Sequence, residues 1–133
     1  MARAGTVFAA TAMLLAAVDL VHKGASGTEQ LHERSWIYAV LVIALTAAWM
    51  AAILATRSFS LALGGGVVAG GALGNLASLA FWHGVPNPIV GERIAFNLAD
   101  VFVVVGFVFV AVAVLALAAS RRDRLGEPVS LRP

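Results

Sequence analysis

The chain contains no cysteine, and charged side chains make up only 12% of its 133 residues. It therefore has no disulfide bonds, no thiolate metal ligands and no lipid-modified cysteine of its own. Hydrophobic residues account for 61% of the sequence, and the mean hydropathy is +0.93. A soluble domain cannot bury that much apolar surface, so the composition predicts a protein embedded in lipid.

Patterns typical of cofactor sites are also missing. The sequence has no phosphate loop, dinucleotide fingerprint, internal repeat or low-complexity tract. Its three histidines are scattered without the spacing of metal ligands: His22, His32 and His83. We therefore expect no metal and no cofactor. The sequence pI of about 9.9 reflects basic residues that flank apolar runs, so we expect no nucleic-acid partner.

Apolar runs long enough to cross a bilayer cover residues 4–21, 36–55, 61–82 and 96–119. In lipid such runs form helices, which satisfy their backbone hydrogen bonds internally. The sequence thus predicts an all-α, polytopic membrane protein, with one four-transmembrane-helix domain over residues 1–120 and a basic tail over 121–133. We interpret the first run as a retained helix, because Asp19 interrupts its outer end and no convincing cleavage site follows.

Lysine and arginine predict the orientation, because cytoplasmic loops carry an excess of both. One side of the predicted bundle carries Arg3, Arg57, Arg121, Arg122, Arg124 and Arg132, and the other carries Lys23, Arg34 and Arg93. Both termini are therefore expected in the cytoplasm. The tail at 121–133 is expected to contact anionic lipid headgroups.

The third apolar run is rich in glycine, and Gly66, Gly70 and Gly74 repeat every four residues. Such a stripe lets the backbone of another helix approach closely, so it predicts helix packing. Asn75 follows directly, and its amide needs a hydrogen-bonding partner within the membrane.

Polar residues on three runs are expected at similar depth. Counted from the outer ends of their helices, Asp19, Asn75, Asn97 and Asp100 all lie within about two turns, at ~1.5 Å per residue. Asn97 and Asp100 also share a helix face. An ionisable group inside a membrane span is expensive, so Asp100 is a candidate functional residue in a polar cavity.

Each of these residues also has a purely structural interpretation. Asp19 and Lys23 are four residues apart and would form an interfacial ion pair that reaches toward water. Asn75 would be a hydrogen-bonding contact between helices. Asp100 would be an acid in the first turn of its helix, where the helix dipole favours negative charge.

Three motifs carry a resemblance to a known family. Residues 70–76 read Gly-Gly-Ala-Leu-Gly-Asn-Leu, residues 96–100 read Phe-Asn-Leu-Ala-Asp, and residues 19–23 read Asp-Leu-Val-His-Lys. In order and position they resemble signal peptidase II, the lipoprotein signal peptidase, a four-helix aspartic endopeptidase of the bacterial inner membrane. The resemblance implies a multi-pass protein of the bacterial cytoplasmic membrane. It also implies that Asp100 belongs to a catalytic pair.

The sequence departs from the family pattern where the second catalytic aspartate is expected. That aspartate lies after the third helix, in a Gly-x-Val-x-Asp-like segment. Here residues 84–88 read Gly-Val-Pro-Asn-Pro, which puts Asn87 or Pro88 at its position. The third-helix motif also has Ser78 and Leu79 in place of Asp-Arg. The outer β-cradle of the family shrinks to residues 24–35.

Aspartic peptidases need two carboxyl groups that share a proton, so that one activates water while the other protonates the carbonyl oxygen. An amide such as Asn87 cannot change its protonation state. Glu92 and Asp19 are the candidate replacement acids. The default interpretation is a member related to this family that keeps the polar cavity and has lost the peptidase activity.

Three hypotheses follow. The first is a protein that binds lipidated or helical signal segments without cleavage. The binding residues would be Asp19, Lys23, Asn75, Asn97 and Asp100. Its partners would be membrane lipid, lipoprotein or signal-peptide helices, or another membrane protein. The second is an active endopeptidase that removes signal peptides from prolipoproteins. The third is a small proton-coupled carrier that uses Asp100 or Asp19.

Overall fold

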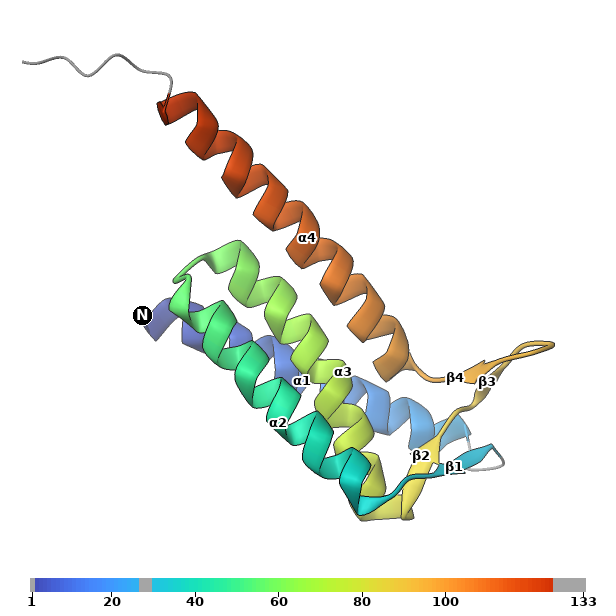
Figure 1. Cartoon of the computed structure of the whole chain (residues 1–133). Helices are drawn as coiled ribbons and strands as arrows, with labels where there is room; N and C mark the ends of the chain where they lie inside the picture. Colours follow the sequence, from blue (N-terminus) through green and yellow to red (C-terminus); the bar gives the residue numbers. More distant parts are fainter. Residues whose placement is uncertain (1, 27–29, 126–133) are drawn as a thin grey trace, which may run out of the picture.

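The computed structural model describes residues 2–26 and 30–125. Its helices are α1 (Ala2–Ser26), α2 (Trp36–Ala55), α3 (Phe59–Trp82) and α4 (Leu98–Leu125). All four are long and apolar enough to cross a membrane. They run in alternating directions, and α4 projects beyond the other three (Figure 1). The predicted all-α, polytopic fold class is confirmed.

Helices α1, α3 and α4 are longer than the predicted apolar runs. The first continues past residue 21 to Ser26, so Lys23, which lies beyond the end of the predicted run, is inside a helix. The fourth begins at Leu98, since Phe96 belongs to a strand, and it runs to Leu125. The predicted tail is therefore helical at its start, and residues 126–133 of it lie outside the described residues.

Serine and histidine residues set the ends of the central helices. The side chains of Ser35 and Ser58 cap the N-termini of α2 and α3, accepting hydrogen bonds from backbone N–H groups of the first turn. His83 ends α3 in the left-handed conformation, with φ of 56°. This turn directs the chain into a strand.

Short strands gather at one end of the bundle, which we call the strand end (Figure 1). Strands β1 (Leu31–Glu33) and β2 (Gly84–Pro86) pair antiparallel, and β3 (Ile89–Val90) pairs with β4 (Ala95–Phe96) in a hairpin. The loop after α1 thus forms a small sheet with the segment after α3, consistent with a reduced outer cradle. This sheet holds the segment that contains Asn87, whose backbone N–H donates to Gln30 O (2.9 Å).

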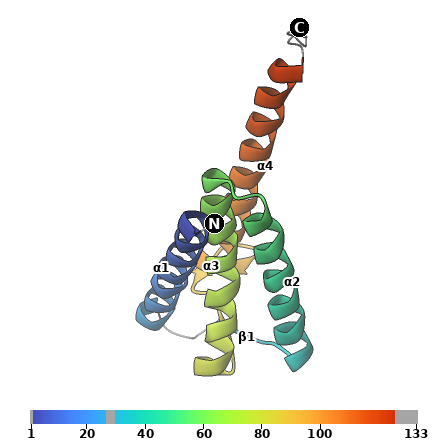
Figure 2. The same cartoon turned by 90° about the vertical axis from the view of Figure 1, so that its left-hand side faces the viewer.

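Helix α3 is the central and most buried helix, and Figure 2 shows it between α1 and α2. Glycines make its contacts close: a Cβ at Gly66 would lie 2.7 Å from the carbonyl oxygen of Phe8, and one at Gly70 would lie 3.0 Å from that of Ala12. On another face, a Cβ at Gly71 would collide with the carbonyl oxygen of Ala99 in α4. The predicted glycine stripe is therefore occupied by α1 of the same chain.

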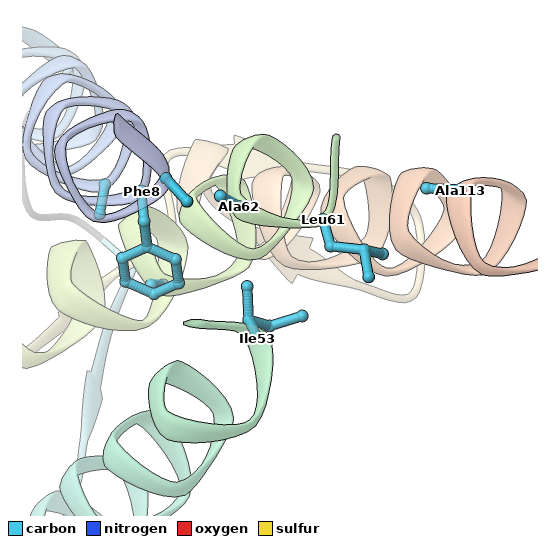
Figure 3. Close-up of a cluster of buried hydrophobic side chains, with 8 residues drawn as sticks. Phe8, Ile53, Leu61, Ala62 and Ala113 are labelled. Atoms are coloured by element: carbon cyan, nitrogen blue, oxygen red, sulfur yellow. The ribbon is translucent and has the colours of Figure 1, made fainter. Parts of the chain in front are cut away.

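A hydrophobic cluster joins all four helices toward the end opposite the strands (Figure 3). Its labelled members are Phe8, Ile53, Leu61, Ala62 and Ala113. The cluster is built mostly from small and branched side chains, which suit the short distance between helices that glycine permits. It leaves the strand end to polar side chains.

We predict that Gly66→Ala destabilises the bundle, while Gly5→Ala does not. The new methyl group at residue 66 meets backbone of α1, which cannot move aside cheaply, whereas a Cβ at Gly5 has nothing within 4 Å. The expected loss for Gly66→Ala is about 1–3 kcal/mol. Thermal unfolding in detergent, followed by circular dichroism, measures both. Equal stability of the two variants would contradict the close α1–α3 packing.

Candidate functional site

Polar side chains from three helices and one loop meet at the strand end. This set, which we call the polar network, consists of Asp19, Lys23, Asn75, Ser78, Asn87, Asn97 and Asp100. All but Asp100 are buried, and Asp100 is half-buried. The residues that the sequence placed at one depth therefore lie within reach of one another in the structure.

A fully buried ion pair anchors the network. Lys23 Nζ lies 2.6 Å from Asp19 Oδ2, and neither side chain is exposed. The same ammonium donates to Asn75 Oδ1 (2.8 Å) and Ser78 Oγ (3.0 Å), so each of its three protons has an acceptor. The alternative of an interfacial pair reaching toward water is therefore wrong, because the longer α1 carries Lys23 against α3.

Asp19 also holds the start of α4. Its Oδ1 accepts a hydrogen bond from the backbone N–H of Ala99 (2.9 Å), in the first turn of that helix. A carboxylate is favoured there by the helix dipole. Room for it comes from Gly74, since a Cβ at that position would lie 2.6 Å from Asp19 Oδ2. Gly74 thus makes space for a charged side chain as well as for a helix.

Asn75 connects the ion pair to Asp100. Its Oδ1 accepts from Lys23 (2.8 Å), and its Nδ2 donates to Asp100 Oδ1 (3.1 Å). An ammonium only donates and a carboxylate only accepts, so these neighbours fix which way the amide points. A contact between helices, the structural interpretation of Asn75, is thus present and leads directly to the candidate functional acid.

Asn97 and Asp100 form a reciprocal cap at the N-terminus of α4. Asn97 Oδ1 accepts from the backbone N–H of Asp100 (3.1 Å), and Asp100 Oδ2 accepts from the backbone N–H of Asn97 (3.2 Å). This is the arrangement of a capping box. Asp100 therefore does serve as a first-turn acid, and its oxygens accept from Asn75 and Asn97.

Asn87 is connected to Asp100 through one intervening residue of the polar network, Asn97. Its Oδ1 accepts from Asn97 Nδ2 (2.7 Å), and its Nδ2 donates to Ala95 O (3.3 Å). That nitrogen also lies 3.2 Å from His32 Nδ1 on β1. Of the two positions that the sequence left open, Asn87 is the one whose side chain enters the network.

No second carboxyl group contacts Asp100 in the described part of the chain. Asp19 is engaged by Lys23 and Ala99, and Glu92 is exposed between β3 and β4. Among the described residues, the side-chain contacts that lead from Asp100 to Asp19 pass through Asn75 and Lys23.

A groove between α2 and α4, floored by α3, leads away from Asp100. We call it the α2–α4 groove. It consists of two adjoining cavities of about 400 and 300 Å³ that share Val42, Ala72 and Val103. The first reaches Asn75, Asp100 and Tyr38; the second is apolar and reaches Trp49 and Phe107. The rings of Trp49 and Phe107 meet edge to face, with centroids 5.1 Å apart, at the apolar end of the groove.

Sequence reasoning missed three residues of this region. Ser78 was noted only as a departure from the family motif, yet it accepts from Lys23 and donates to Gly74 O (2.7 Å). Tyr38 lines the groove beside Asp100, and His32 contacts Asn87. Ser78 could have been predicted from the sequence, because it lies about one helical turn after Asn75 and so shares its helix face. The other two depend on how separate segments pack.

We predict that Lys23→Met destabilises the protein by about 3–5 kcal/mol, because it leaves the Asp19 carboxylate buried without its counter-ion. Adding Asp19→Asn should recover much of that loss, since the amide oxygen can still accept from Ala99. Chemical denaturation in mixed micelles measures the single and double variants. If the double variant were less stable than Lys23→Met, the ion pair would not be the source of the effect.

The chain matches the family model described as Signal peptidase (SPase) II over residues 7–116. This range contains the whole polar network and the α2–α4 groove. No match was found among curated proteins or among solved structures. Because the match covers most of the chain, the protein belongs to the signal peptidase II family.

Proposed function

We propose that this membrane protein binds lipidated or helical signal segments in the α2–α4 groove and does not hydrolyse them. The observation that carries the proposal is that Asp100 receives hydrogen bonds from Asn75 and Asn97 and faces no second acid among the described residues. The site would lie near the outer face of the bacterial cytoplasmic membrane, with both termini on the cytoplasmic side.

The shape of the groove supports a ligand that enters from lipid. Tyr38 and Trp49, near its two ends, are separated on α2 by a helical rise of about 16 Å. The walls between them are apolar, and the polar end contains Asn75 and Asp100. An acyl chain or an apolar helix would fit along the walls, and the adjoining peptide groups would meet hydrogen-bonding side chains.

The chemistry of the site argues against hydrolysis. A carboxylate that accepts two hydrogen bonds can orient a water molecule, but the second step needs an acid that donates a proton to the carbonyl oxygen. By the resemblance, Asn87 stands at or near the position of that acid in the family. Its Nδ2 donates to Ala95 O and lies 3.2 Å from His32 Nδ1.

We expect a photo-reactive group at residue 103 to crosslink to a diacylated lipopeptide, because Val103 lines both cavities of the groove. The matched control is residue 108, since Val108 is an exposed valine on the same helix, about 140° around it at 100° per residue. Crosslinking is measured in nanodiscs by mass spectrometry. Equal labelling from both positions would indicate contact with bulk lipid only and would contradict binding in the groove.

We further expect the wild-type chain to leave a lipid-modified precursor intact, and Asn87→Asp to cleave it. A second carboxyl group would complete the acid–base pair, which contributes roughly 10²–10⁴-fold to such reactions. Gel-based processing of a radiolabelled prolipoprotein measures this, and adding Asp100→Asn should abolish the gain. Cleavage by the wild type that disappears in Asp100→Asn would instead identify an active peptidase with a replacement acid.

A further inference from the structure

The charges of the polar network do not cancel. Lys23 forms its ion pair with Asp19, and it interacts with the Asp100 charge at longer range, with Asn75 hydrogen-bonded to both side chains. The other cation near the groove is Arg34, whose guanidinium lies over the ring of Tyr38 at 5.3 Å from the centroid. No cation forms an ion pair with Asp100 among the described residues. One carboxylate is therefore left without a contacting counter-ion.

This carboxylate is also the half-buried one. Asp100 lines the polar cavity of the groove together with Asn75 and Tyr38, while Asp19 and Lys23 are sealed from solvent. Both Asp100 oxygens accept hydrogen bonds from N–H donors, which hold the carboxylate in place at the cavity. A negative charge at the edge of an apolar groove favours a ligand that carries a positive charge at that depth.

From these contacts we infer that the preferred ligand carries a primary ammonium group next to its acyl chains, and that Asp100 binds this ammonium. Within the proposed function, on which this inference rests, one ligand has that chemistry: a lipopeptide whose lipid-modified cysteine is the N-terminal residue. Its α-amino group is free and charged. In an uncleaved precursor the same nitrogen is an uncharged amide.

The geometry separates the two ligands. The free ammonium brings three donors to a carboxylate that has lone pairs left after two hydrogen bonds. A precursor brings one amide donor and no compensating charge. Among the lipidated segments of the proposed function, the groove would thus bind one with a free amine more tightly than one whose nitrogen is an amide.

The test compares one synthetic diacylglyceryl-cysteine peptide in two forms, with a free N-terminus and with an N-acetylated one. The full-length protein is placed in phosphatidylcholine nanodiscs, and binding is measured by microscale thermophoresis. A charge-assisted contact predicts roughly 10–100-fold tighter binding of the free amine. Asp100→Asn should remove this difference and leave the affinity for the acetylated form nearly unchanged. Glu92→Gln, which neutralises an exposed acid at the same end, should preserve it.

Three results would overturn the inference. Equal affinity of both peptide forms for the wild type would remove the ammonium preference while leaving binding in the groove intact. A preference that survives Asp100→Asn would assign the ammonium to another residue. Competition by phosphatidylethanolamine as strong as that of the free-amine peptide would assign the site to a lipid headgroup. Absence of binding by either peptide would instead reject the proposed function itself.

Discussion

The strand end of this protein depends on the ammonium group of Lys23. It is fully buried, where an isolated charge costs several kcal/mol, and its protons are shared among Asp19, Asn75 and Ser78. Through Asp19 it fixes the first turn of α4, and through Asn75 it fixes the side chain that meets Asp100. Helices α1, α3 and α4 are thus held in register by hydrogen bonds at one end and by glycine contacts along their length.

Capping at the start of α4 fixes the orientation of the Asp100 carboxylate. An acid that only stabilised a helix terminus would be expected to face solvent, but here the reciprocal bonds with Asn97 hold the carboxylate at the mouth of the α2–α4 groove. The structural and functional interpretations of Asp100 are therefore compatible, since the cap supplies the orientation that a ligand would need.

Sequence patterns predicted the four helices well, because hydropathy depends on local composition. They placed Asp19, Asn75, Asn97 and Asp100 at one level, and the structure joins them. They failed where packing decides: one interpretation had Lys23 reaching toward water, because a lysine at the end of an apolar run normally does so. Its burial depends on Asn75 and Ser78, which approach from a different helix. Likewise, the contact of His32 with Asn87 follows from the β1–β2 pairing, and no local pattern encodes it.

The amide at residue 87 fits its surroundings better than a carboxylate would. Its Nδ2 faces the carbonyl oxygen of Ala95, and its Oδ1 faces the Nδ2 of Asn97, so both ends have complementary partners. An ionised aspartate at the same position would place negative charge against the Ala95 carbonyl and near Asp100, and would be tolerated only when protonated. The loop is thus adapted to a neutral side chain. Among the described residues that line the groove, Asp100 is then the one that carries a charge.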